Sequence, residues 1–183
     1  ATTIDRKLSA LSKMLATAVE CGKLGKKPSF KKFLSKLSKK QTRRKAYLSD
    51  AEEREFLDKV LVHAEKETNG KWKMFFDFVC FLIDTGARTN TEGLALPATD
   101  VQFQSNSILF WETKTGTPRA VPMTPRVKTI MELRVKQAKN NKLWYLLSKD
   151  SVRHYWDTIR AEMNWQDSKD HCPYLCRHTT ASR

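Results

Sequence analysis

Residues 72–92 read WKMFFDFVCFLIDTGARTNTE and join the most apolar stretch of the chain to a polar motif. Apolar side chains lie on nearly every face of a helix drawn over residues 72–84, which predicts a central helix that is buried all round. A membrane span needs about 20 consecutive apolar residues. Met74–Ile83 is much shorter and contains Asp77, so it is expected to be a core helix.

Outside this helix, the pattern predicts a mainly helical α+β fold with a small three-stranded antiparallel sheet. Alternating residues indicate strands at 101–103, 108–111 and 119–121. Further helices are expected over residues 3–20, from a capping box at Ser49 and Glu52 to a stop at Asn69-Gly70, from Thr124 to about Lys139, over 151–163, and after Pro173.

Positive charge is concentrated at the start of the chain. The net charge is +14, and residues 1–45 carry 14 Lys/Arg against 2 Asp/Glu, whereas residues 46–183 carry 20 against 18. Clustered Lys and Arg are typical of phosphate binding, which favours nucleic acid as the partner. A solvated lysine-rich tail is the alternative. A membrane surface fits less well because residues 26–45 lack the large apolar face of an interfacial helix.

Three short motifs follow one another along the second part of the chain. Gly86 turns the chain and leaves Arg88 at the start of a short helix. Residues 113–122 read TKTGTPRAVP, and residues 174–182 read YLCRHTTAS and contain Arg177. In this order and with this spacing, the motifs resemble those of the tyrosine recombinases, the phage integrase family.

The resemblance implies a catalytic role for four residues. Two planar guanidinium groups can each hold two phosphate oxygens, so Arg88 and Arg177 would stabilise the transition state of phosphodiester cleavage. Lys114 would protonate the departing 5′ oxygen as the general acid. Tyr174, three residues before Arg177, stands where the family usually has histidine, and its hydroxyl would donate a hydrogen bond to the phosphate.

Other residues are expected to support this site or to contact DNA. Glu92 lies four residues after Arg88, where many relatives have three, and is interpreted as a structural carboxylate. His178 matches a second family histidine and is expected to make a structural hydrogen bond. The residues predicted to bind DNA are Arg6, Lys7, Lys13, Arg43, Arg44 and Arg119.

The resemblance also divides the chain into three parts. Residues 1–22 are similar to the last helix of a core-binding domain, because RKLSAL at 6–11 matches that helix and a single amphipathic helix cannot bury its own stripe. Residues 23–46 would be a basic linker, and residues 47–183 most of a catalytic domain. In the family the nucleophilic tyrosine follows the second arginine, whereas Tyr47, Tyr145, Tyr155 and Tyr174 all precede Arg177. The nucleophile is therefore expected beyond residue 183, and the fragment alone is expected to be inactive.

The implied activity is site-specific DNA recombination or integration through a 3′-phosphotyrosyl intermediate. Double-stranded DNA would be the partner, and the active form would be a homotetramer on DNA, in the cytoplasm of a bacterium and encoded by a phage or mobile element. A catalytically inactive DNA-binding relative is the alternative. The resemblance implies no metal or other cofactor. A zinc site is not expected either, because His171, Cys172, Cys176 and His178 lack the short Cys-x-x-Cys spacing of structural zinc sites.

Overall fold

The structure is a computed structural model, and it describes residues 2–30, 46–111 and 116–183. The chain divides into two compact units, Ala1–Arg44 and Lys45–Arg183. In the first unit, α1 (Thr2–Glu20) is followed by Gly22 in the left-handed region at φ 68°. The N–H of Lys23 donates to the carbonyl of Ala18 at 2.9 Å, and this closes the end of the helix. The basic residues Arg43, Arg44 and Lys114 lie outside the described residues.

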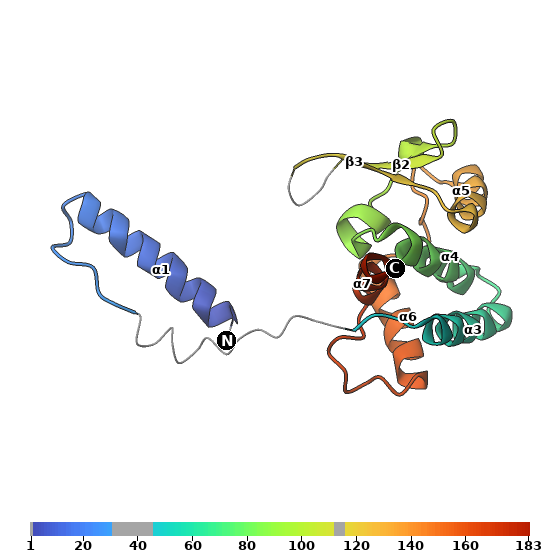
Figure 1. Cartoon of the computed structure of the whole chain (residues 1–183), viewed down its shortest axis with the longest axis horizontal. Helices are drawn as coiled ribbons and strands as arrows, with labels where there is room; N and C mark the ends of the chain where they lie inside the picture. The colour runs from blue at the N-terminus through green and yellow to red at the C-terminus, as the bar shows by residue number, and fades with distance from the viewer. Residues whose placement is uncertain (1, 31–45, 112–115) are drawn as a thin grey trace. The chain divides into compact units, whose positions relative to one another are not determined.

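The second unit is mainly helical and carries a small sheet, as the sequence predicts (Figure 1). Its elements are α3 (Asp50–Lys66), α4 (Lys71–Thr85), a π-helix η1 (Thr89–Leu94), a 3₁₀ turn η2 (Ala98–Asp100), β1 (Val101–Gln102), β2 (Ser107–Phe110), β3 (Arg119–Pro122), α5 (Pro125–Gln137), α6 (Lys149–Glu162) and α7 (Leu175–Ser182).

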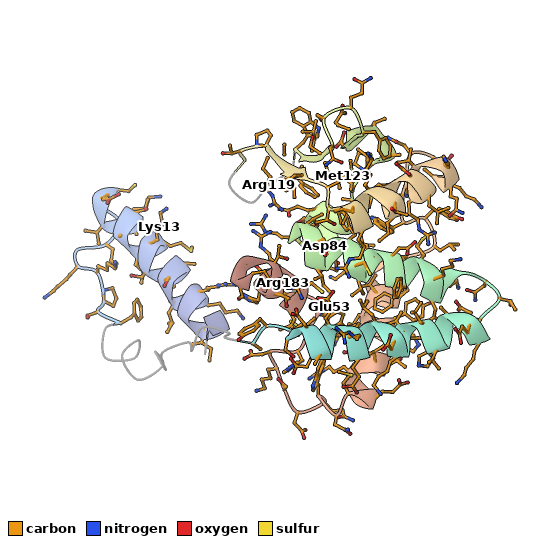
Figure 2. The ribbon with its side chains drawn as sticks, turned by 45° about the vertical axis from the view of Figure 1, so that its right-hand side comes forward. Lys13, Glu53, Asp84, Arg119, Met123 and Arg183 are labelled. Carbon is orange, nitrogen blue, oxygen red and sulfur yellow. The ribbon has the colours of Figure 1, made fainter. Side chains whose placement is uncertain are left out.

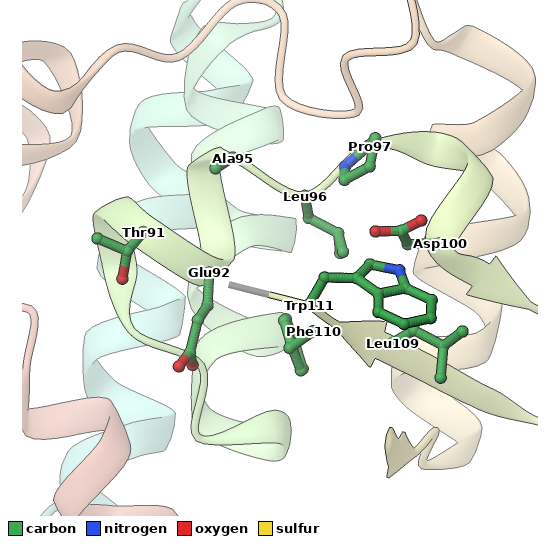
Figure 3. Close-up of a pocket in the computed structure, with 9 residues that line it drawn as sticks. All are labelled: Thr91, Glu92, Ala95, Leu96, Pro97, Asp100, Leu109, Phe110 and Trp111. Carbon is green, nitrogen blue, oxygen red and sulfur yellow. The ribbon is translucent and has the colours of Figure 1, made fainter. Parts of the chain in front are cut away.

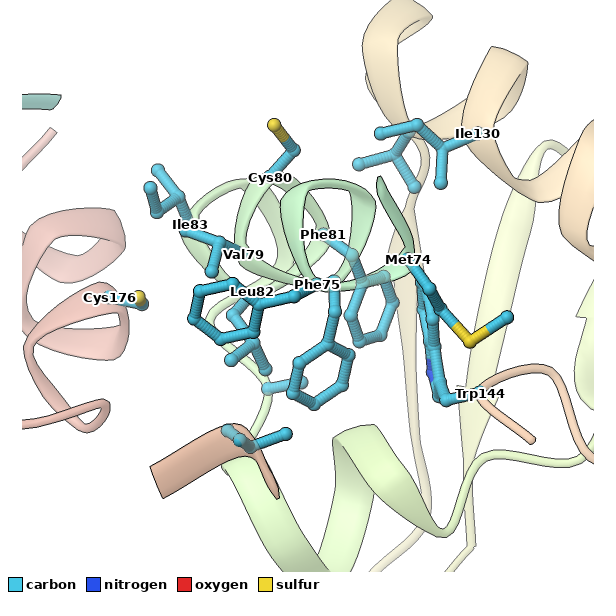
Figure 4. Packing of buried hydrophobic residues seen from close by; sticks show 14 of the residues in the cluster. Met74, Phe75, Val79, Cys80, Phe81, Leu82, Ile83, Ile130, Trp144 and Cys176 are labelled. Atoms are coloured by element: carbon cyan, nitrogen blue, oxygen red, sulfur yellow. The ribbon is translucent and has the colours of Figure 1, made fainter. Parts of the chain in front are cut away.

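Helix α4 is the centre of this unit and contacts α3, α5, α6 and α7. Phe75, Phe78 and Phe81 are fully buried along it, and Trp144 packs against the last two with ring centroids 5.0 and 5.5 Å away. Figure 4 shows Phe75, Phe81 and Trp144 beside α4, with Cys176 of α7 on the opposite side from Trp144. Burying one such side chain stabilises the fold by about 1.5–3 kcal/mol. Among the described residues, no helix is both long and apolar enough to cross a bilayer.

The sheet has the order β1-β2-β3, and both pairings are antiparallel. Ile108 and Phe110 of β2 point into the core, and Phe110 pairs with Arg119 at the start of β3. This register places Arg119 at the end of the β2–β3 hairpin that adjoins the connecting loop. The strand expected at 101–103 is one residue shorter, and the strand expected at 108–111 is shifted by one residue toward the N-terminus.

Two helix boundaries show how well local capping can be predicted. The capping box is confirmed: the Ser49 hydroxyl accepts from the N–H of Glu52, whose carboxylate accepts from the N–H of Ser49 at 2.9 Å. The predicted stop at Asn69-Gly70 is wrong, because α3 already ends at Lys66. The side chain of Asn69 instead accepts from the N–H of Lys71 at 3.0 Å, so it caps the start of α4.

Buried ion pairs tie the helices to one another. Arg134 of α5 donates to Asp77 of α4 at 2.6 Å, and both side chains are nearly inaccessible to solvent. Arg126 joins Asp84 and Glu53, and Glu53 also accepts from Arg183 at 2.6 Å. Figure 2 labels three of these residues, Glu53, Asp84 and Arg183, which lie near one another where α3, α4 and α7 meet. The contacts position the end of α4, which leads directly to Arg88.

Candidate active site

Three arginines from distant parts of the sequence converge on Glu92, whose side chain is fully buried. The guanidinium of Arg88 donates to Glu92 Oε1, and the backbone N–H of Arg88 donates to Oε2 at 2.9 Å. Arg119 Nη2 donates to the same Oε2 at 2.7 Å, and Arg177 Nη1 lies 3.6 Å from it. The start of η1, strand β3 and helix α7 thus each deliver one guanidinium to a single carboxylate.

The π-helix η1 places Glu92 beneath Arg88. The N–H of Gly93 donates to the carbonyl of Arg88 at 2.7 Å, which is the i→i+5 bond of a π turn. Close packing holds this turn on α4, because a Cβ at Gly93 would lie 3.1 Å from atoms of Leu82 and Phe78. Gly93 therefore allows η1 to approach α4 closely enough to bury the Glu92 side chain.

Helix α7 brings Arg177 to the same place. Gly86 ends α4 in the left-handed region at φ 61°, and its carbonyl accepts from Arg177 Nη1 at 2.5 Å. Thr180, one turn further along α7, donates to the carbonyl of Ile83 at 2.6 Å. A Cβ at Gly86 would lie only 3.3 Å from the Thr180 side chain, so a glycine here suits both the turn and the approach of α7.

The Glu92 carboxyl stays ionised although it is buried. Burial alone would raise the pKa of Glu92, but hydrogen bonds from the Arg88 backbone and the Arg119 side chain, with the charges of both arginines, outweigh it and lower the pKa below 4.5. Three guanidinium groups around one carboxylate leave the cluster with an excess of positive charge. The side chains of Arg88, Arg119 and Arg177 are 26%, 33% and 29% exposed, so each retains a solvent-facing part that can meet an anion.

Comparison with known proteins identifies the fold. No protein-family model matches the chain, and no curated protein matches it in sequence. Among solved structures, the Tn1549 transposon integrase in complex with circular intermediate DNA matches the whole chain with a TM-score of 0.74 at 22% identity. The chain has the tyrosine recombinase fold. It spans 66% of the length of that integrase chain, which is just under two thirds.

Two further structures agree with this assignment. A second complex of the Tn1549 integrase with a circular intermediate DNA has a TM-score of 0.76 at 21% identity and also covers the whole chain. The XerH site-specific recombinase, in its pre-cleavage complex with the difH substrate, has a TM-score of 0.56 at 20% identity. That match covers 75% of this chain and 42% of the XerH chain. The expected tyrosine recombinase fold is therefore confirmed.

Within this fold, the residues predicted for catalysis are placed as follows. Arg88 and Arg177 come together, and Lys114 lies outside the described residues. Tyr174 directly precedes α7 and is 40% exposed, and its ring meets that of His178 edge-on at 5.1 Å. The backbone N–H of His178 donates to the carbonyl of Tyr174 at 3.4 Å, which holds these two residues in the first turn of α7.

The other predicted residues separate into the two units. Arg6, Lys7 and Lys13 lie along α1 and are exposed, whereas Arg119 is part of the arginine cluster. In the described part of the chain, no group of three or more His, Cys, Asp or Glu side chains could hold a metal ion. The free cysteines there include Cys80, where burial raises the pKa of the thiol to about 12.

The contact between Arg119 and Glu92 is the part of the site that sequence reasoning missed. The two residues are 27 positions apart and belong to different motifs, and Glu92 was expected to be structural without a partner on the hairpin. One signal was present in the sequence: Glu92 is the single acidic residue among the three motifs, which contain three arginines and a lysine. Several arginines close together repel one another, so a buried carboxylate among them is expected as their shared counter-ion.

A pocket of about 290 Å³ adjoins the cluster. Figure 3 shows Thr91 and Glu92 at one end of this pocket and Asp100 and Trp111 at the other, with Leu96 between them. Its lining includes the apolar side chains of Leu96, Leu109 and Phe110. The pocket therefore gives η1 and β2 a shared hollow next to the charged site.

Proposed function

We propose that the protein is a site-specific DNA recombinase or integrase that cleaves and rejoins DNA strands through a 3′-phosphotyrosyl intermediate. The observation that carries this proposal is the convergence of Arg88, Arg119 and Arg177 on the buried Glu92, within the tyrosine recombinase fold. Arginine can hold non-bridging phosphate oxygens bidentately, and such a preorganised clamp is a large term in catalysis of phosphoryl transfer.

The charge of the cluster suits the reaction. A phosphodiester carries one negative charge, and attack by an oxygen nucleophile adds a second to the phosphoryl oxygens in the transition state. Three guanidinium groups and one ionised carboxylate together carry two net positive charges. The cluster therefore complements the transition state better than the ground state, which is the condition for faster chemistry rather than tighter binding.

The remaining chemical roles follow from the resemblance and stay part of the proposal. Lys114 protonates the leaving 5′ oxygen, and Tyr174, exposed at the start of α7, donates to a phosphate oxygen. The attacking tyrosine is supplied by a part of the protein that is not among these 183 residues. Tyr155 is unsuited to this role because it packs against Trp72, with ring centroids 4.5 Å apart, and burial raises the pKa of its hydroxyl.

DNA contacts outside the clamp come from the basic residues of the first part of the chain. We assign this role to Arg6, Lys7 and Lys13 of α1, and to Arg43 and Arg44. On this proposal, α1 closes a core-binding domain, residues 23–46 form the basic linker, and residues 47–183 belong to the catalytic domain. The active form is a homotetramer on DNA in the cytoplasm of a bacterial host.

The clamp can be tested with a nicked suicide substrate that traps the covalent DNA–protein complex. In the longer protein, Arg88→Ala or Arg177→Ala should abolish the complex, while duplex affinity falls only a few-fold because many other phosphate contacts remain. Arg153→Ala is the control, since Arg153 of α6 is 81% exposed and, among the residues that the structure describes, forms its ion pair with Asp157 of the same helix. This variant should form the complex like the parent.

Two outcomes would count against the proposal. Normal trapping by Arg88→Ala would show that the cluster does not stabilise the transition state. If the parent protein binds duplex DNA but never traps it, even with its own recombination site, the protein is a catalytically inactive DNA-binding relative.

A further inference from the structure

We propose that Arg119 is a positioning residue: it holds Glu92 in the orientation that presents Arg88 and Arg177 to the phosphate, and it couples the β2–β3 hairpin to that clamp. The link to catalysis rests on the proposed function, whereas the positioning of Glu92 can be measured without it.

The Arg119 side chain is 33% exposed, and the contacts that the structure describes for it lie inside the site. Its Nη2 donates to Glu92 Oε2 at 2.7 Å, and its guanidinium carbon lies 4.9 Å from the centre of the Phe110 ring. Its Nε is buried, and within the described part of the chain this atom has no hydrogen-bond partner. These contacts suit an arginine whose main role is inside the site.

Oε2 of Glu92 accepts two hydrogen bonds and also lies within ion-pair distance of a third group. Oε1 accepts from Arg88, whereas Oε2 accepts from the Arg88 backbone and from Arg119 and lies 3.6 Å from Arg177. Arg119 approaches from β3, on a different element from both other arginines. With the two bonds from Arg88, its bond therefore helps to hold the rotation of the carboxylate about its last torsion angle, and that rotation decides whether Oε2 faces Arg177.

The same bond reaches the hairpin that bears Lys114. Arg119 is the first residue of β3 and pairs with Phe110, the last residue of β2. The Phe110–Arg119 pair is therefore the last strand pair of the hairpin, next to the connection that contains Lys114. The ion pair from Arg119 to Glu92 links this loop end of the hairpin to Arg88 and Arg177. The positions of the hairpin and of the two phosphate-binding arginines therefore depend on one another.

The pKa of Glu92 reports the contact between Arg119 and Glu92, on which the positioning role depends. The charged groups facing Glu92 are Arg88 before η1, Arg119 on β3 and Arg177 on α7. The pKa of Glu92 is lowered although its burial acts in the opposite direction, and both the hydrogen bond and the charge of Arg119 contribute. Without Arg119, burial weighs more heavily, so the Glu92 pKa should rise and the carboxylate should be lost at mildly acidic pH.

The first experiment is a ¹³C NMR titration of the glutamate carboxyl groups of the 183-residue chain, with the Glu92 signal assigned from Glu92→Gln. Arg119→Ala should raise the Glu92 midpoint by about one pH unit or more, and Arg119→Lys should restore part of the shift by returning the charge. Arg160→Ala is the control, because Arg160 of α6 is similarly exposed, at 23%, and its contacts are with Asp157 and with backbone carbonyls after α6 rather than with Glu92. The Glu92 midpoint should not move in the control.

The second experiment measures covalent complex formation by the longer protein across pH. Arg119→Ala should lower kcat at least tenfold with little change in KM for DNA, and its acid limb should move to higher pH in parallel with the Glu92 midpoint. An unchanged Glu92 midpoint in a folded Arg119→Ala protein would overturn the positioning role, whatever the DNA assay shows. If the midpoint moves but the parent protein never cleaves DNA, the positioning role stands and the proposed function fails.

Discussion

The substitution Glu92→Gln tests the shared counter-ion most sharply because it removes the charge and keeps the shape. Glu92 is fully buried and accepts three hydrogen bonds, two of them from guanidinium groups. Removing one partner of a buried ion pair costs about 3–5 kcal/mol. Glutamine keeps one acceptor oxygen, so the expected loss is near the lower end, about 3 kcal/mol. For a domain of this size, that loss corresponds to a fall of about 10 °C in Tm.

Activity should fall further than stability suggests. Without the carboxylate, Arg88, Arg119 and Arg177 repel one another, and a displacement of about 1 Å at a reacting group can cost about 10²-fold in rate. Duplex affinity should stay the same or rise slightly, because the site gains one unit of positive charge. Thermal unfolding, a duplex-binding titration and suicide-substrate trapping, each done with the parent and with Glu92→Gln, would separate these effects.

The pH dependence of stability gives an independent check that the ionised form of Glu92 stabilises the fold. The pKa of Glu92 is lowered from 4.5 in the folded protein, so its ionised form stabilises the fold above that value, and the contribution is lost as the pH falls through the folded-state pKa. Glu92→Gln should therefore lose the parent's extra stability at neutral pH and show a shallower decline below about pH 4.5. A Glu92→Gln protein that melts and cleaves like the parent would refute the shared counter-ion.

Two further substitutions examine the support of the site and its acid. Gly93→Ala should destabilise the protein by about 1–3 kcal/mol, because the new methyl group would lie 3.1 Å from Leu82 and Phe78; Gly25→Ala, with no atom within 4 Å, is the control, and equal urea midpoints would contradict the close packing of η1. Lys114→Ala should slow cleavage of ordinary DNA sharply but cleave a 5′-phosphorothiolate substrate at close to the parent rate, because sulfur leaves without a proton. Equal defects on both substrates would assign the acid to another residue.

Local signals in the sequence carry much of the fold. The apolar stretch over residues 72–84 predicts the central helix α4, and alternation predicts the three strands to within about a residue. Ser49 and Glu52 predict the start of α3 because a capping box is a contact between near neighbours. The stop at Asn69-Gly70 is predicted wrongly because both residues suit either the end of one helix or the start of the next, and composition does not distinguish the two.

Contacts between distant segments of the chain limit how much of the site can be predicted from the sequence. Arg88 and Arg177 can be singled out because each lies in a motif of its own, whereas their meeting depends on the docking of α7 beside Gly86. The burial of Glu92 and its bond to Arg119 depend on the placement of the β2–β3 hairpin over η1. A charged side chain has no periodicity that reveals a partner 27 residues away, so sequence reasoning left Arg119 among the DNA contacts.

The π-helix η1 also has a consequence for how this site tolerates a change in chain length. In an α-helix, one residue inserted between Arg88 and Glu92 would rotate the carboxylate by about 100° about the helix axis. In η1 the bond from Gly93 to Arg88 spans five residues, so the wider turn takes up one residue more and Glu92 still lies under Arg88. A single residue inserted between Arg88 and Glu92 therefore widens one turn, and the same residues still form the site.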